Sequence, residues 1–202
     1  TGLEDHIGGF RKLSEFYQER ARGGVGLIVT GGVSPDFCGQ LALFSSRLSY
    51  HWQVYRHRKL TAAVHAAGSR ICMQVLHAGR YAMHPFAVAP SPIKAPISLF
   101  KPREMSPKKI QRTIKAYVKT AMLAKKAGYD GVEIMGSEGY LINQFMSPHT
   151  NLRTDDYGGS VENRGRFALE VYQKIRNTVG PDYPVLIKMN IADNMEGGLV
   201  SE

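Results

Sequence analysis

Four short apolar runs along the chain predict buried strands. The runs are 25–29, 71–75, 131–134 and 184–188, and polar residues interrupt them only rarely. A parallel sheet is usually covered on both faces, so its strands have nearly continuous apolar sequences rather than alternating ones. The pattern therefore predicts a parallel sheet with both faces covered.

Between these runs, apolar residues recur at helical spacing. The clearest stripe consists of Ile110, Ile114, Tyr117, Ala121 and Ala124, with Ser106 and Pro107 before it and Gly128 after it. Serine at the N-cap, proline in the first turn and glycine beyond the last turn are typical of helix boundaries. Three similar patterns are Leu13, Phe16 and Tyr17 before Gly23; Leu60, Ala63, Val64 and Ala67 before Gly68; and Ala168, Val171, Tyr172 and Ile175 before Gly180.

The alternation of helices and strands predicts an α/β fold built from repeated βα units. Right-handed crossovers allow a doubly wound sheet or a (β/α)8 TIM barrel, and periodicity alone fits both. The chain opens on a helical pattern, and 197–202 resembles the start of another helix. A full barrel needs roughly 250 residues. If the fold is a barrel, we expect residues 1–202 to be an incomplete single domain of about four βα units, without the first strand and the last units.

The connection 76–105 is unusually long and rich in proline. It holds five of the ten prolines in the chain: Pro85, Pro90, Pro92, Pro96 and Pro102. Long loops in compact domains are often binding loops or lids, and this one follows the end of a strand where barrel enzymes keep their active sites. We therefore expect it to border the site.

Composition excludes several classes of protein. The 202 residues contain 43% hydrophobic and 21% charged side chains, and no apolar run is long enough to span a membrane. The N-terminus has no secretory signal pattern. The net charge of +9 is spread along the chain, without the zinc spacing or aromatic interleaving typical of nucleic-acid binding. Cys38 and Cys72 suggest neither a disulfide framework nor a metal site, so we expect a cytoplasmic protein without bound metal.

Polar residues at the predicted strand ends are the candidates for chemistry. Gln74 and Lys188 interrupt apolar strands, and Glu138 and Tyr140 follow the strand 131–134. A buried lysine is costly unless it is paired or faces a ligand. Taken singly, each residue has a structural explanation; their convergence on one rim favours a site. The chain has no phosphate-binding P-loop, no complete G-x-G-x-x-G after a strand, no G-x-S-x-G and no H-E-x-x-H.

A long motif gives a specific family resemblance. Residues 139–148, GYLINQFMSP, and 151–164, NLRTDDYGGSVENR, resemble the segment after the fourth strand in the Old Yellow Enzyme superfamily of FMN-dependent oxidoreductases. The resemblance covers essentially the whole chain and implies an FMN-binding TIM barrel. The aspartates, glycines and Asn-Arg pairs of the motif are typical of turns and caps rather than of catalysis.

The neighbouring sequence Met135-Gly-Ser-Glu-Gly-Tyr140 resembles the bacterial 2,4-dienoyl-CoA reductases. Many ene-reductases of the superfamily carry two histidines, or histidine and asparagine, at the positions of Met135 and Glu138. The resemblance implies Tyr140 as proton donor and Glu138 as its support. It also implies that Gly32, Gln74 and Lys188 contact FMN, and that His149 and Asn151 contact the substrate. Lys188 stands where the family often has arginine.

The expected activity is reduction of an activated C=C bond, in the first place that of a 2,4-dienoyl-CoA, with hydride from NAD(P)H passed through FMN. The alternatives are an ene-reductase acting on an enoate or enone, a non-redox phosphate-binding barrel such as an aldolase, and a non-catalytic binding module. The dienoyl-CoA reductases also carry an iron–sulfur cluster and FAD, and motifs for neither occur in this chain. The expected partners are small molecules, with no nucleic acid and no membrane.

Overall fold

The computed structural model describes residues 2–6 and 8–199. The main elements are α1 (Gly9–Arg22), β1 (Leu27–Val29), α2 (Val54–Ala66), β2 (Arg70–Val75), β3 (Val88–Ala89), β4 (Arg103–Glu104), α3 (Pro107–Lys126), β5 (Gly131–Gly136), α4 (Leu141–Met146), α5 (Val161–Val179) and β6 (Val185–Met189). Short 3-10 turns lie at Leu3–Asp5, His51–Gln53 and Gly79–Tyr81. All four predicted strands and all four predicted helices are therefore present.

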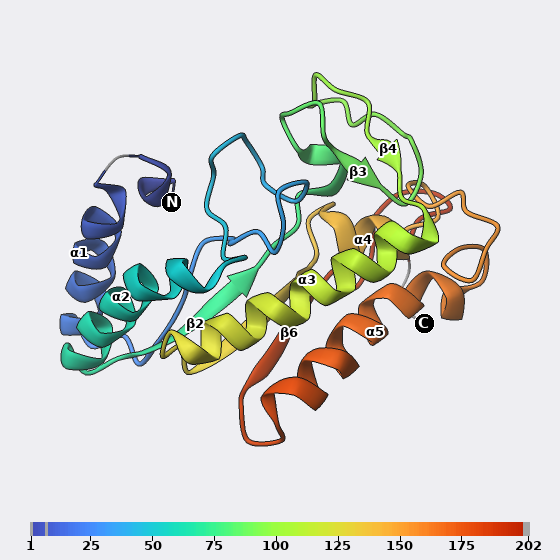
Figure 1. Ribbon diagram of the computed structural model, residues 1–202. Coiled ribbons are helices and arrows are strands. Elements are labelled where there is room, and N and C mark those ends of the chain that lie inside the picture. Colours follow the sequence, from blue (N-terminus) through green and yellow to red (C-terminus); the bar gives the residue numbers. More distant parts are fainter. Residues whose placement is uncertain (1, 7, 200–202) are drawn as a thin grey trace.

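The main sheet has the strand order β1-β2-β5-β6, and every neighbouring pair is parallel. Helix α2 connects β1 to β2, α3 connects β2 to β5, and α4 with α5 connects β5 to β6 (Figure 1). Parallel neighbours joined by helices are the repeated βα units that the sequence predicts.

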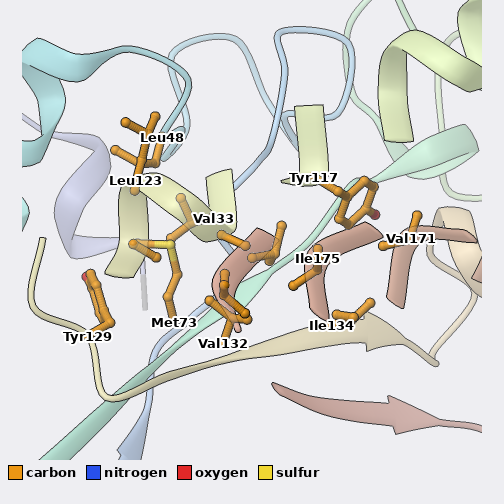
Figure 2. Packing of buried hydrophobic residues seen from close by; sticks show 14 of the residues in the cluster. Val33, Leu48, Met73, Tyr117, Leu123, Tyr129, Val132, Ile134, Val171 and Ile175 are labelled. Atoms are coloured by element: carbon orange, nitrogen blue, oxygen red, sulfur yellow. The ribbon is translucent and has the colours of Figure 1, made fainter. Parts of the chain in front are cut away.

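The helices pack against one face of the sheet. Met73, Val132 and Ile134 point to this face and pack with side chains of α3 and α5, among them Tyr117, Val171 and Ile175 (Figure 2). The alternate strand residues, such as Gln74 and Glu133, point to the opposite face. A doubly wound sheet carries helices on both faces, whereas a barrel carries them on the outside. The fold is an incomplete (β/α)8 barrel.

The expectation that both faces are covered along every strand is wrong at the two outer strands. Leu27 and Val29 of β1 are 49% and 37% exposed, and Leu186 of β6 is 37% exposed. These side chains project from the face opposite the helices. Their apolar character suits the interior of a barrel, which is why the sequence alone predicts burial for them.

Local sequence explains where the helices begin and end. The hydroxyl of Ser106 accepts a hydrogen bond from the Lys109 amide, and Pro107 occupies the first turn of α3. The Ser160 hydroxyl caps α5 in the same way, through the Asn163 amide. Each such cap contributes about 1 kcal/mol by satisfying a helix N–H group.

Helix α4 is too short to be predicted from periodicity, and packing holds it in place. Leu141, Ile142 and Phe145 are fully buried, and the Phe145 ring stacks on Phe167 of α5 with centroids 4.3 Å apart. A six-residue helix is not stable alone, so this burial fixes its position. The start of α4 is therefore rigidly placed at Tyr140.

The predicted long connection 76–105 is partly structured. It contains the turn Gly79–Tyr81 and the two short parallel strands β3 and β4, and it rises above the strand ends (Figure 1). The loop 147–160 is attached to this connection by the buried Arg153. Its side chain donates hydrogen bonds to the carbonyl oxygens of Pro90 at 2.9 Å and Met105 at 2.7 Å. The motif residues around Arg153 thus build structure, as the sequence indicates.

The remaining expectations concern the chain end and the membrane. Gly198 lies in a turn, its amide bonded to the Met195 carbonyl at 3.0 Å, and the rest of the expected C-terminal helix, 200–202, lies outside the described residues. Within the described part of the chain, no helix combines the length and apolarity needed to cross a membrane.

Candidate functional site

Four of the predicted site residues, Gln74, Glu138, Tyr140 and Lys188, lie near or just after the C-terminal ends of strands. Gln74 of β2 and Glu133 of β5 are register partners on the face opposite the helices. The Gln74 amide Nε2 donates to Glu133 Oε1 at 2.7 Å. Gln74 therefore presents a polar edge on the inner face of the barrel, rather than packing among apolar side chains.

Lys188 of β6 forms an ion pair with Glu138, whose carboxylate accepts a hydrogen bond from the lysine. Glu138 has a left-handed backbone, with φ of 59°, and its amide donates to Asn190 Oδ1 at 3.1 Å. The hydrogen bond and charge of Glu138 raise the pKa of Lys188. Two predicted residues thus meet: Lys188 of β6, which is assigned to the cofactor, and Glu138 of the turn after β5, which is assigned to catalysis.

Tyr140 lies two residues after Glu138, directly before α4, and is half-buried. Its ring meets that of Tyr81 edge to face, with centroids 5.8 Å apart. Burial raises the pKa of Tyr140, and the nearby charge of Glu138 and the neighbouring Tyr81 raise it further, against a smaller opposing effect of Lys188. Tyr140 therefore keeps its proton at neutral pH.

A cleft of about 220 Å³ opens beside Tyr140, and we call it the rim cleft. Its walls include Gly32, Gly39, Ser45, Ser46, Leu76 and Tyr140. A Cβ atom added to Gly32 would lie 2.6 Å from Leu76 Cδ1. The family resemblance implies that Gly32 contacts the flavin. In the structure, a side chain at this position would have to displace Leu76.

His149 lies in a second hollow of about 250 Å³, on the other side of Gly139 and Tyr140. Its Nε2 donates to the Glu196 carbonyl at 2.9 Å. Tyr81 also lines this hollow, and a Cβ on Gly139 would lie 2.3 Å from the Tyr81 hydroxyl. The structure thus separates His149 from the rim cleft by this short segment.

Asn151 is buried, and its side chain forms hydrogen bonds within the surrounding loop. Its Nδ2 donates to the carbonyls of Phe145 at 2.6 Å and Tyr157 at 2.7 Å, and its Oδ1 accepts from the Arg153 amide. These bonds shape the loop 147–160, so we leave Asn151 out of the proposed site.

A partly buried ionic cluster supports the loop that forms a wall of the rim cleft. Asp36 accepts hydrogen bonds from Lys109 Nζ at 3.0 Å and from the Gly39 amide at 2.9 Å, and His77 Nε2 lies 3.5 Å away. Burial lowers the pKa of His77 to about 4, so the ring is neutral at neutral pH. Burial alone would raise the pKa of Asp36, but His77 and Lys109 bring it below its usual value. The cluster joins the loops after β1 and β2 to α3.

Sequence reasoning missed Glu133, Leu76 and Tyr81. A glutamate within an apolar strand is the same signal that identified Gln74, so Glu133 could have been found. Leu76 and Tyr81 carry no such signal, because their roles arise from packing across the rim. Among the described residues, no group of three or more histidine, cysteine, aspartate or glutamate side chains is placed to hold a metal ion.

Comparisons with known proteins match the chain over nearly all of its length. Residues 3–201 match the model of the NADH:flavin oxidoreductase / NADH oxidase family. A metal reductase of Desulforamulus reducens is 45% identical over 190 residues, which cover 92% of this chain and 28% of the relative.

Solved structures show the same fold. A 2-naphthoyl-CoA reductase in complex with 2-naphthoyl-CoA matches with a TM-score of 0.86 and 35% identity, over 92% of this chain and 31% of that one. An Old Yellow Enzyme from Pichia sp. AKU4542 matches with a TM-score of 0.82 and 31% identity, over 92% of this chain and 52% of that one. The chain thus spans between about a quarter and a half of the length of these proteins.

Proposed function

The chain belongs to the NADH:flavin oxidoreductase / NADH oxidase family, and we propose that it acts as an FMN-dependent oxidoreductase that reduces an activated C=C bond with hydride from NAD(P)H. The observation that carries the proposal is the position of Tyr140 in the rim cleft, with Glu138 and Lys188 beside it. The resemblance to the Old Yellow Enzyme superfamily is confirmed by the family match and by the matching fold.

The residues around the strand ends suit a flavin. Gln74 offers an amide, which can both donate and accept, as the pyrimidine edge of a flavin requires. Lys188 supplies positive charge, which favours the negatively charged reduced cofactor over the oxidised one. We propose that these two residues bind FMN and that Gly32 lies beside it. When bound, FMN supplies the hydride that NAD(P)H has delivered to it.

Tyr140 then has the role of proton donor. Hydride addition to the far carbon of the conjugated system leaves negative charge on the substrate, which a proton on carbon must neutralise. The pKa of Tyr140 lies above its ordinary value of about 10, so the hydroxyl arrives protonated and can donate to a strong carbon base. The charge of Glu138 helps to raise the pKa of this tyrosine, and the hydrogen bond from Lys188 holds the Glu138 carboxylate in place.

We propose a CoA thioester, in particular a 2,4-dienoyl-CoA, as the substrate. The motif from Met135 to Tyr140 supports this choice, and so does the similarity to the 2-naphthoyl-CoA reductase. An enoate or an enone is the alternative. The family match favours flavin chemistry over the non-redox barrel considered from the sequence.

The substrate class is tested by comparing kcat/KM for a 2,4-dienoyl-CoA, an enoate and a cyclic enone, each with NADH and with NADPH. We expect the highest value for the dienoyl-CoA. A higher value for the enone would refute the thioester assignment but leave ene-reduction in place. If the full-length, flavin-loaded protein reduces none of the three, the proposed function itself is wrong.

Replacing Gly32 with valine is expected to weaken FMN retention by about tenfold or more, because an overpacked site typically costs roughly 1–3 kcal/mol. The measurement is bound FMN after dialysis, followed by absorbance. Gly26→Ala is a matched control, since a Cβ there meets nothing within 4 Å.

The double variant Gly32→Val/Leu76→Ala separates two explanations for such a loss. It removes the side chain that the new valine would strike first. If FMN retention stays low, valine obstructs the cofactor directly. If retention returns to normal, the loss came from displaced Leu76, and the placement of FMN beside Gly32 is contradicted.

A further inference from the structure

An exposed patch of aromatic and basic side chains lies where the loop after β1 enters α2. We call it the aromatic–basic patch, and its members are Arg47, Tyr50, Trp52 and Lys119. Trp52 is 70% exposed and Tyr50 is 48% exposed. Exposed aromatic side chains gathered in this way mark a site of interaction rather than a part of the core.

The side chains of the patch are arranged around the Tyr50 ring. The rings of Tyr50 and Trp52 are nearly parallel, at 10° with centroids 6.3 Å apart. Arg47 Cζ lies 5.6 Å and Lys119 Nζ 5.4 Å from the centre of the Tyr50 ring. Flat aromatic faces stack on nucleobases, and cations beside them attract phosphates.

Arg47 and Lys119 also line a hollow of about 190 Å³, together with Phe37, Ser49 and Tyr50. The carboxylate in its wall belongs to Asp36, which is already paired with Lys109. The buried Nε atom of Arg47 has no hydrogen-bond partner among the described residues. The hollow therefore combines two cations with one carboxylate that is already paired, which leaves a net positive charge and suits a phosphate.

The loop 45–50 leads along the chain from the rim cleft to the patch. Ser45 and Ser46 line the cleft, and the next residue, Arg47, lines the hollow. From Ser45 to Tyr50 the chain can extend at most about 18 Å. A ligand with its reactive group at Tyr140 can thus cross this loop and reach the patch, provided that a long arm joins its two ends.

We propose that the aromatic–basic patch binds the adenosine 3′,5′-bisphosphate end of a CoA thioester whose acyl group lies in the rim cleft. Adenine stacks on Trp52, and the phosphates contact Arg47 and Lys119. The pantetheine arm of CoA supplies the connection over the loop 45–50. This inference rests on the proposed reduction of a thioester and assigns the part of the chain that recognises its nucleotide.

Trp52 is the only tryptophan among these 202 residues, so the part of the fluorescence that is lost in Trp52→Phe reports on the patch. The flavin-loaded, full-length protein is titrated with adenosine 3′,5′-bisphosphate. We expect saturable quenching, and about tenfold weaker binding in Arg47→Met and in Lys119→Met, because each removes one charged contact. Lys174→Met is the control, since this lysine pairs with Glu170 on α5. Absence of quenching overturns the proposal, as does quenching by NADPH or an oligonucleotide but not by the bisphosphate.

A kinetic comparison tests the same assignment during turnover. The substrates are a dienoyl-CoA and the matching N-acetylcysteamine thioester, which lacks the nucleotide. Trp52→Ala is expected to raise KM for the CoA thioester about tenfold, with kcat and the kinetics of the short thioester unchanged. An unchanged KM for the CoA thioester overturns the proposal. If neither thioester is reduced, the proposed function fails, while the fluorescence titration still decides whether the patch binds the nucleotide.

Discussion

Replacing Tyr140 with phenylalanine is expected to slow substrate protonation by roughly 10²–10⁴-fold, the usual contribution of a general acid. The variant keeps the ring that packs against Tyr81 and loses only the hydroxyl, so the rim cleft should keep its shape. Hydride transfer precedes the protonation and does not use the hydroxyl. Flavin reoxidation should therefore stay fast while release of the reduced product becomes slow.

The measurement is stopped-flow absorbance on the full-length protein, with flavin reoxidation and product formation followed separately. Tyr172→Phe is the control, because this tyrosine lies partly exposed on α5. Product formation at the wild-type rate in Tyr140→Phe would show that Tyr140 is not the donor. Equal slowing of both steps would point to a distorted site instead, which circular dichroism and FMN retention would reveal.

Replacing Arg153 with methionine is expected to lower the free energy of unfolding by roughly 2–4 kcal/mol, because each buried carbonyl left without a donor costs about 1–3 kcal/mol. The Arg153 side chain is 4% exposed and pairs with Asp155 and Glu104. It also donates to the carbonyls of Pro90 and Met105, which the variant would leave without this donor. The loop 147–160 would lose its attachment to the connection 76–105.

Urea denaturation measures this change. Arg166→Met is the matched control, since Arg166 is exposed and its hydrogen bonds to described residues go to its own loop and helix, through the Asp156 carbonyl and Asn163. We expect its effect to stay within about 0.5 kcal/mol. A loss of less than about 1 kcal/mol in Arg153→Met would contradict the assigned structural role.

The strands and long helices could be predicted because their sequence pattern follows directly from burial. Ile110, Ile114 and Tyr117 all face the core, and Ser106 caps their helix as its sequence indicates. Periodicity could not distinguish a barrel from a doubly wound sheet, because strand sequences do not record which face the helices cover. It could not show the exposure of Leu27 and Leu186 either, because an apolar side chain inside a barrel and one in a packed core have the same pattern.

The short elements escaped prediction for a different reason. Helix α4 depends on the burial of Phe145 against Phe167 of a later helix, and strands β3 and β4 depend on pairing within a long connection. Interactions between residues distant in sequence decide these elements, and local patterns do not contain them.

At the site, the sequence predicts polar residues at one rim but does not specify how they pair. Gln74 bonds to Glu133, and Glu138 bonds to Lys188, although the two residues of each pair come from different segments. Such pairings depend on strand register. For Asn151, the family resemblance implies substrate contact, whereas the structure shows hydrogen bonds that hold a loop together.

The most direct test of the central claim is one anaerobic cycle of the full-length protein observed at the flavin absorbance. The account predicts yellow protein that NADH or NADPH bleaches and that a 2,4-dienoyl-CoA recolours, with one equivalent of reduced product formed for each flavin. A colourless protein that takes up no FMN, or bleached flavin that only oxygen and no C=C compound can reoxidise, would contradict it.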